Sequence, residues 1–141
     1  MGIRPGSSVS EVNEAIKGTL PALLGIEYVD VQYGHVVSRM DLRSELLAPT
    51  NGLLHGGAIV TIADSACGVG TALSLPEGAR GHATVEVKAN FIGSVRQGSV
   101  SCEAQLVHGG RSTQVWDATV RDEQTRKVIA VFRCTQLLFR E

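Results

Sequence analysis

The chain has 141 residues, of which 43% are hydrophobic and 19% charged, and its formal net charge is −1. A chain of this length can bury a substantial core, and the balanced charge argues against nucleic acid as a main partner. The sequence has neither an uninterrupted apolar run of membrane-spanning length nor the apolar core of a signal peptide. We therefore expect a cytoplasmic protein that is not held in a membrane.

The N-terminal segment predicts helix. Residues 1–7 read as a loose start, and residues 9–18 predict a short helix with apolar residues along one side. Pro21 indicates a break before the first strand. We expect residues 1–24 to form a helical extension of a single domain that spans 1–141.

Alternating polar and apolar residues predict the strands. Residues 26–33 and 35–42 predict a hairpin that turns at Gly34, and residues 43–54 predict a loop. Four further strands are predicted in the second half of the chain, over 84–91, 99–106, 113–120 and 128–139. One face of the first of these four carries only apolar residues: Val85, Val87, Ala89 and Phe91.

Between these two groups of strands, residues 58–73 predict a helix that is apolar nearly all round, and such a helix is buried. Asp64 lies in its middle, and a buried Asp is rare unless it is paired or functional. Gly56 and Gly57 stand at its start, where free N–H groups and the helix dipole favour developing negative charge. One helix therefore offers a carbonyl-polarising end and a candidate base or nucleophile.

The predicted order of elements limits the architecture. A helix with apolar residues all round cannot simply lie on one side of a flat sheet. A strongly curved antiparallel sheet wrapped around one long central helix would bury most of its circumference. We therefore expect an α+β fold of this kind, in which the uncovered face of the helix needs a partner, most simply a second copy of the chain.

The motif Gly-x-x-His-Gly-Gly at 52–57, with Asp64 two turns later, resembles that of the hotdog-fold acyl-CoA thioesterases. The closest likeness is to small single-domain enzymes of the phenylacetate-pathway (PaaI-like) branch, and it covers roughly 25–138. The resemblance implies a hotdog fold and an acyl-CoA substrate. It also implies that the Gly56 N–H polarises the thioester carbonyl and that Asp64 acts as nucleophile or general base. Thr84 would then help to position the water or the acid.

One position departs from the pattern of that family. The family usually has an Asn six residues before the His, and this chain has Pro49 there. Two residues are candidates for the missing role. Either Asn51 takes the role of the family's Asn from a shifted loop, or His55 takes over more of that role. Apart from this, we expect the His55 ring to orient the loop.

A Gly-Gly turn within residues 108–111 predicts a hairpin, and a plain hairpin is the simplest interpretation. In the resembled family this hairpin lies near the nucleotide end of CoA. By resemblance, Arg111 and Ser112 are therefore candidates for contacts with the CoA phosphates. Gly57 is the third residue that we assign to substrate and CoA binding.

Helix geometry predicts the assembly. Gly56 and Asp64 are eight residues apart, which is about 12 Å along a helix at ~1.5 Å per residue. A donor to the carbonyl must lie within ~3 Å of its oxygen, and the group that activates the nucleophile must also be within reach. Two antiparallel helices about a two-fold axis can satisfy both conditions, so we predict an obligate homodimer with two shared sites. A dimer of dimers, giving a homotetramer, is implied by resemblance only.

We therefore predict hydrolysis of an acyl-CoA thioester to the free acid and CoA, without a cofactor or a metal. Two alternatives are a hotdog dehydratase or hydratase, which places a His and an acid differently along the helix, and a non-catalytic acyl-CoA-binding module, which would not need Asp64. The pattern does not distinguish an aryl from an aliphatic acyl group. Three cysteines lie in apolar segments without metal-like spacing, which predicts buried free thiols in a reducing compartment: Cys67, Cys102 and Cys134.

Overall fold

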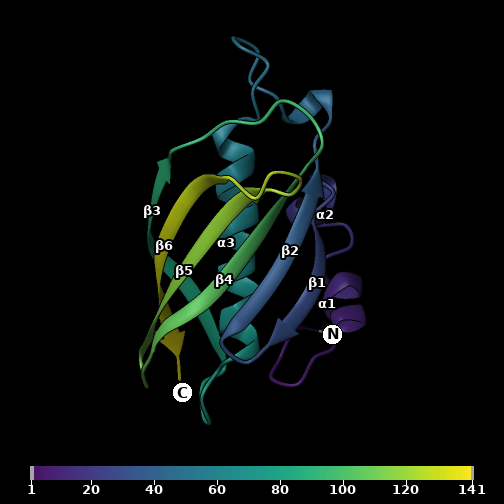
Figure 1. The fold of residues 1–141 in the computed structure, drawn as a ribbon. Helices are drawn as coiled ribbons and strands as arrows, with labels where there is room; N and C mark the ends of the chain where they lie inside the picture. Colours follow the sequence, from purple (N-terminus) through teal and green to yellow (C-terminus); the bar gives the residue numbers. More distant parts are fainter. Residues whose placement is uncertain (1, 141) are drawn as a thin grey trace.

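The structure is a computed structural model that describes residues 2–140. Its sheet has the strand order β1-β2-β4-β5-β6-β3, and every neighbouring pair of strands is antiparallel. The sheet curves around the long helix α3 (Figure 1), which confirms the predicted α+β architecture. The elements are α1 (Val9–Ala15), α2 (Leu20–Leu23), β1 (Glu27–Gln32), β2 (His35–Asp41), the 3-10 turn η1 (Ser44–Leu46), α3 (Gly56–Leu73), β3 (Gly81–Phe91), β4 (Ser99–Gly109), β5 (Thr113–Asp122) and β6 (Val128–Phe139).

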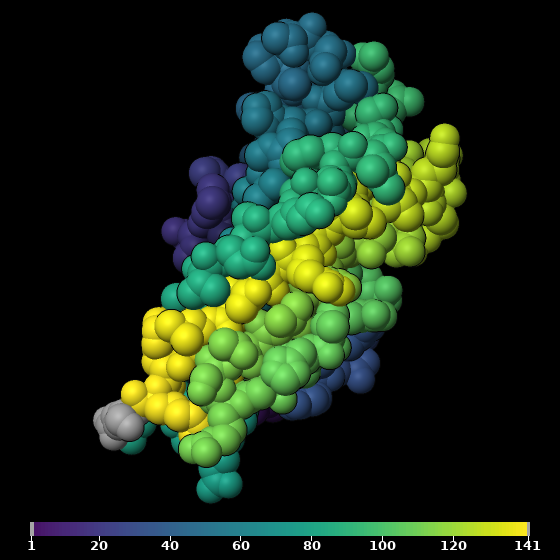
Figure 2. Space-filling view, turned by 90° about the vertical axis from the view of Figure 1, so that its left-hand side faces the viewer, coloured from purple at the N-terminus to yellow at the C-terminus, as the bar shows by residue number. Residues whose placement is uncertain are grey.

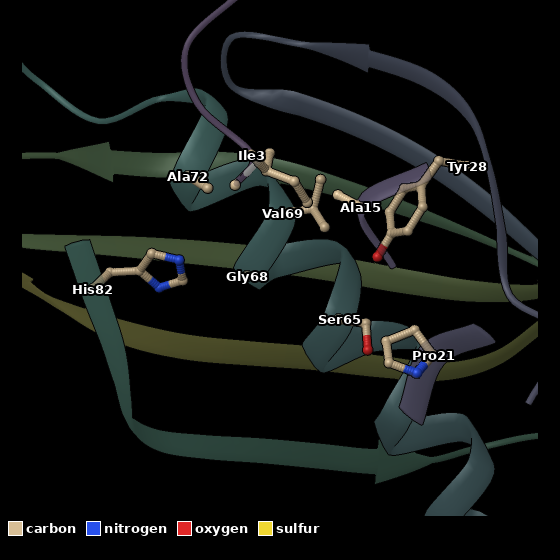
Figure 3. A pocket seen from close by; sticks show the side chains of 10 residues that line it. Ile3, Ala15, Pro21, Tyr28, Ser65, Gly68, Val69, Ala72 and His82 are labelled. Carbon is tan, nitrogen blue, oxygen red and sulfur yellow. The ribbon is translucent and has the colours of Figure 1, made fainter. Parts of the chain in front are cut away.

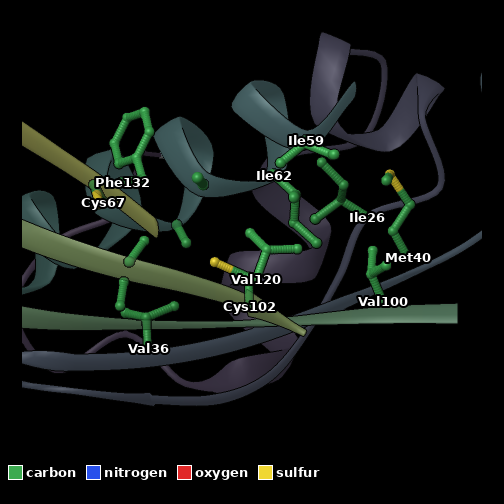
Figure 4. Packing of buried hydrophobic residues seen from close by; sticks show 14 of the residues in the cluster. Ile26, Val36, Met40, Ile59, Ile62, Cys67, Val100, Cys102, Val120 and Phe132 are labelled. Carbon is green, nitrogen blue, oxygen red and sulfur yellow. The ribbon is translucent and has the colours of Figure 1, made fainter. Parts of the chain in front are cut away.

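Helix α3 forms the centre of the core because its apolar residues meet the concave face of the sheet (Figure 4). Ile62, Ala66 and Cys67 are fully buried on it, and the helix packs against all six strands. Within the described residues α3 is also the one helix that is long and apolar enough to cross a membrane. Its burial inside the sheet identifies it as the core helix of the fold.

The N-terminal segment is more ordered than the sequence predicts. Residues 2–7 form no helix or strand, as expected of a loose start, but Ser7 is buried and its hydroxyl accepts a hydrogen bond from the Arg4 N–H at 3.1 Å. Helix α1 ends at Ala15, three residues earlier than predicted. Pro21 does not break the chain but lies in the first turn of α2, where a missing N–H costs no intrahelical hydrogen bond.

Strand β3 leaves an uncovered edge. It begins at Gly81, three residues before the predicted start, and pairs on one side only, with β6. Its apolar side chains are not covered within one chain, since Val85 is 57% exposed and Phe91 52%. In the space-filling view this strand runs along the surface beside β6 (Figure 2). An unpaired, apolar edge strand is a surface to which another strand can add.

Candidate active site

Asp64 lies on α3, where the helix faces β3. The residue is half-buried, and its Oδ1 atom is buried without a hydrogen-bond partner among residues 2–140. Burial raises the pKa of the Asp64 carboxyl above its usual value, while a hydrogen bond from Thr84 and the positive charge that His82 carries when its ring is protonated act against that rise. A carboxylate with a raised pKa and a free oxygen is suited to act as a base or a nucleophile.

Thr84, to which the family resemblance assigns a role in positioning the water or the acid, lies beside Asp64 on β3. Its hydroxyl is also 3.1 Å from Oε1 of Gln136, because the two residues are paired across β3 and β6, and its one proton can be given to either acceptor. The same Gln136 oxygen lies 3.2 Å from Nδ1 of His82. Three polar side chains of two adjacent strands are therefore clustered beside the carboxylate.

The start of α3 provides free donors, as predicted for Gly56. His55 is the N-cap, and its Nδ1 accepts a hydrogen bond from the Gly57 N–H at 2.8 Å. The Gly56 N–H has no hydrogen-bond partner in the described part of the chain. Because Nδ1 of His55 is an acceptor, the neutral ring carries its proton on Nε2, which becomes a second donor at this end of the helix.

Asn51 occupies a tight turn before the helix. Its side-chain oxygen accepts a hydrogen bond from the Leu53 N–H at 3.0 Å, and its carbonyl accepts one from Arg96 at 2.7 Å. The Asn51 side chain is thus engaged with its own loop, and no hydrogen bond joins it to Gly56 or Asp64 within residues 2–140.

The β4–β5 hairpin lies at the other end of α3 from Gly56. Arg140 links the two regions, since it donates to the carbonyl of Arg111 at 3.0 Å and to that of Glu77, just after α3, at 3.2 Å. Arg111 and Ser112 are exposed at the tip of this hairpin. In a single chain, therefore, they are not adjacent to Gly56.

A cavity of about 440 Å³ opens along the side of α3, and Ser65, the residue that follows Asp64, is part of its lining. His82 and Tyr28 reach it from opposite elements, β3 and β1 (Figure 3). Small or apolar residues make up most of the remaining wall: Gly2, Ile3, Ala15, Pro21, Gly68, Val69 and Ala72, together with Ser65.

The sequence analysis missed three of these polar residues. His82, Gln136 and Tyr28 belong to no local motif, and 54 residues separate His82 from Gln136. One signal was available for Gln136, a polar residue within the final strand, which is apolar on both faces.

Comparison with known proteins identifies the family. A family model of the thioesterase superfamily matches residues 51–129. A 1,4-dihydroxy-2-naphthoyl-CoA hydrolase from Listeria monocytogenes is 36% identical over 116 residues, which are 82% of this chain and 92% of that protein. The crystal structure of thioesterase HI1161 from Haemophilus influenzae is similar with a TM-score of 0.89 at 26% identity, covering 99% of this chain and 96% of that one.

The predicted likeness to the PaaI branch is also seen in the fold. The PaaI protein of E. coli, from the phenylacetic acid degradation operon, is similar with a TM-score of 0.76 at 22% identity, covering 84% of this chain and 83% of that one. The chain belongs to the thioesterase superfamily, and it is an enzyme of hotdog fold that hydrolyses thioesters. The named relatives are hydrolases, which favours hydrolysis over dehydration.

Proposed function

We propose that this enzyme hydrolyses an acyl-CoA thioester to the free acid and CoA, and that Asp64 is its central catalytic residue. The observation that carries the proposal is the Asp64 Oδ1 atom, which is buried in an apolar helix without a partner. Leaving a buried acceptor unsatisfied typically costs about 1–3 kcal/mol. A side chain whose burial destabilises the fold and whose pKa is perturbed is a candidate functional group. Three buried free thiols support a reducing, cytoplasmic location.

The proposed reaction begins with polarisation of the thioester carbonyl. The Gly56 N–H lies at the positive end of α3 without a hydrogen-bond partner in the described part of the chain, and the Nε2–H of His55 is a second donor there. We assign to His55 the role that the family gives to an amide at position 49, while Asn51 shapes the loop. Loss of one such donor typically costs ~2.7–4 kcal/mol of transition-state stabilisation.

Asp64 then delivers or activates the nucleophile. Either its carboxylate attacks the carbonyl carbon, expelling the CoA thiolate and forming an anhydride that water hydrolyses, or it takes a proton from the water that attacks. Both routes require the anion. Thr84 is proposed to orient the carboxylate or the water through its hydroxyl, and its hydrogen bond to Asp64 supports this role.

Each site is proposed to use two chains. Gly56 and Asp64 are both on α3, about 12 Å apart along its axis at ~1.5 Å per residue, so one helix cannot bring both to one carbonyl. The open apolar edge of β3 supports pairing with a second β3 about a two-fold axis. We therefore propose a homodimer in which Gly56 of one protomer faces Asp64 of its partner.

The same arrangement supports a CoA-binding role for the hairpin. In an antiparallel pair, the end of α3 beside Arg111 lies near the start of the partner helix. Arg111, Ser112 and Gly57 are therefore proposed to contact CoA, with the Arg111 guanidinium on a phosphate. A dimer of dimers is proposed to use the outer sheet face, which carries partly exposed apolar residues on β6: Val131, Leu137 and Phe139. Analytical ultracentrifugation distinguishes dimer from tetramer.

We propose an aromatic acyl group. The Listeria relative is a hydrolase of 1,4-dihydroxy-2-naphthoyl-CoA, and the wall of the cavity along α3 is mostly small or apolar, with Gly68, Val69 and Ala72 on the helix. A largely apolar wall with a few polar groups is suited to an aromatic ring.

A thiol-release assay tests the proposal. Wild type, Asp64→Asn and the exposed control Asp30→Asn are compared on benzoyl-CoA and hexanoyl-CoA. We expect Asp64→Asn to lower kcat by roughly 10²–10⁴-fold, as for loss of a general base, and Asp30→Asn to retain activity. An Asp64→Asn enzyme with most of the wild-type rate would contradict the assignment. Binding of CoA esters without any turnover by wild type would indicate a non-catalytic module.

A further inference from the structure

The polar cluster on β3 and β6 fixes the orientation of one histidine ring. Gln136 is fully buried, and its Oε1 accepts hydrogen bonds from the Thr84 hydroxyl and from Nδ1 of His82. Since an amide oxygen is an acceptor only, Nδ1 of His82 must carry the proton. The Nε2 atom of the neutral ring is then an acceptor with no partner among residues 2–140.

That acceptor faces the cavity. In the close-up view the His82 ring reaches from β3 towards Gly68 on α3 (Figure 3), and His82 is one of the residues that line the cavity. The ring lies against Gly68, where an added Cβ would be 3.9 Å from Cε1 of His82. Gly68 thus leaves room for a ligand group next to the ring.

A second unused polar group lines the same cavity from the opposite side. Tyr28 is 1% exposed, and its hydroxyl is buried without a hydrogen-bond partner in the described part of the chain. The Tyr28 ring reaches from β1 towards Ser65 on α3 (Figure 3). A fold rarely keeps a buried hydroxyl unpaired, because burial removes the hydrogen bonds that water would supply.

We propose that His82 and Tyr28 are specificity-determining residues that recognise a hydroxyl substituent on the acyl group, and that Gln136 is the positioning residue for His82. A hydroxyl on the β3 side of the cavity can donate to Nε2 of His82, and a hydroxyl on the β1 side can accept from the Tyr28 hydroxyl. A purely apolar acyl group satisfies neither atom, and sites built to bind a hydroxyl reject analogues that lack it. A carboxylate on the acyl group would not bind in the same way, because its oxygens and Nε2 of His82 are all hydrogen-bond acceptors. This inference rests on the proposed acyl-CoA hydrolysis and adds the feature that selects the acyl group.

The test compares kcat/KM for benzoyl-CoA with that for its 2-, 3- and 4-hydroxy derivatives. We expect wild type to prefer at least one hydroxylated ester by about tenfold or more. Tyr28→Phe and His82→Phe should each reduce this preference ratio by about tenfold, while His82→Gln, which keeps a hydrogen-bonding group, should restore part of it. Tyr33→Phe is the matched control, because Tyr33 is 72% exposed on the surface and lies outside the cavity. It should leave the ratio unchanged.

The positioning role of Gln136 has its own readout. Gln136→Met should lower the preference ratio in the wild-type background but should not lower it further in the His82→Phe background, because both changes remove the same contact. An additive effect would assign Gln136 a purely structural role and overturn this part of the inference.

Folding of Tyr28→Phe provides a second measurement. If the hydroxyl serves a ligand, its removal should leave the melting temperature of the unliganded protein unchanged or raised. A large decrease would mean that the fold uses this hydroxyl and would overturn the inference. Turnover with no preference, or with a preference that the variants do not change, would also overturn it while the proposed hydrolase function stands. No thiol release from any of these esters or from hexanoyl-CoA would overturn the proposed function itself.

Discussion

The contact between Gly70 and Trp116 makes the packing of α3 testable. A Cβ added at Gly70 would lie 2.5, 2.6 and 3.0 Å from three carbon atoms of the Trp116 ring. Ordinary carbon–carbon contacts are about 3.5–4.0 Å, so ring or helix would have to move by roughly 1 Å. The ring cannot slide freely, because Trp116 is fully buried and its Nε1–H donates to Gln114 at 2.8 Å, while Gln114 in turn donates to the Ser74 carbonyl.

Two terms of opposite sign determine the effect of Gly70→Ala on the free energy of unfolding. Overpacking a core costs typically about 1–3 kcal/mol, whereas Gly→Ala inside a helix stabilises by up to ~1 kcal/mol. We expect a net loss of roughly 1–2 kcal/mol. Gly68→Ala is the matched control on the same helix, because its Cβ meets only Cε1 of His82 at 3.9 Å. It should be neutral or up to ~1 kcal/mol more stable.

Urea denaturation followed by tryptophan fluorescence measures both variants, and Trp116 is the only tryptophan of the chain. All samples need the same protein concentration, because the stability of the proposed dimer would depend on it. The midpoint should fall for Gly70→Ala with little change in the slope of free energy against urea. Gly70→Ala as stable as wild type, or Gly68→Ala equally destabilised, would refute this account of the packing.

Four further predictions concern the site. Burial raises the pKa of Asp64, so on acidification the rate should fall at a pH above 3.8, the usual value for Asp; an acid limb at or below that pH would contradict the assignment. The pKa of Asp64 is higher in the folded state than in the unfolded state, so the protein loses stability as the pH rises from 3.8 through the folded-state pKa and Asp64 ionises. Asp64→Asn should therefore melt at a higher temperature than wild type at pH 7, and this difference should shrink towards pH 3.8. Gly56→Pro places Pro at the first position of α3, where the backbone tolerates it. It should lower kcat by roughly 10²–10³-fold, whereas Gly56→Ala, which keeps the N–H but touches Phe91 at 3.2 Å, should lose less. Arg111→Ala should raise KM for CoA esters more than for short thioesters without the nucleotide; equal changes for both would remove Arg111 from the CoA site.

Much of the fold could be predicted from the sequence, because its signals are local. The period of apolar residues around Asp64 indicates a buried helix, and alternation indicates the strands. The family motif then supplied the fold. Pro21 was misjudged because a proline stops a helix only in its interior, and position in the helix is not visible in the sequence alone. Ser7 was misjudged because its burial depends on tertiary packing.

The site was less predictable because it depends on contacts between distant segments. Thr84 could be placed beside Asp64 through the family resemblance, but nothing local connects His82 with Gln136 across β3 and β6. The apolar face of β3 was read from alternation, yet Val85 is exposed in one chain. In the proposed dimer this apolar face belongs to an interface rather than to the core of the monomer, and alternation in a single sequence does not distinguish these two uses.

Subunit mixing tests the central claim, a hydrolytic site made from Gly56 of one protomer and Asp64 of its partner. Inactive Asp64→Asn and inactive Gly56→Pro homodimers are dissociated, mixed and reassembled, and subunit exchange is verified with distinguishable tags. A heterodimer then contains one site with both residues intact and one site with both replaced. The account predicts that activity returns, at up to about half of the wild-type rate per heterodimer. Verified heterodimers that remain inactive would contradict it, since they would mean that each site is made within one chain.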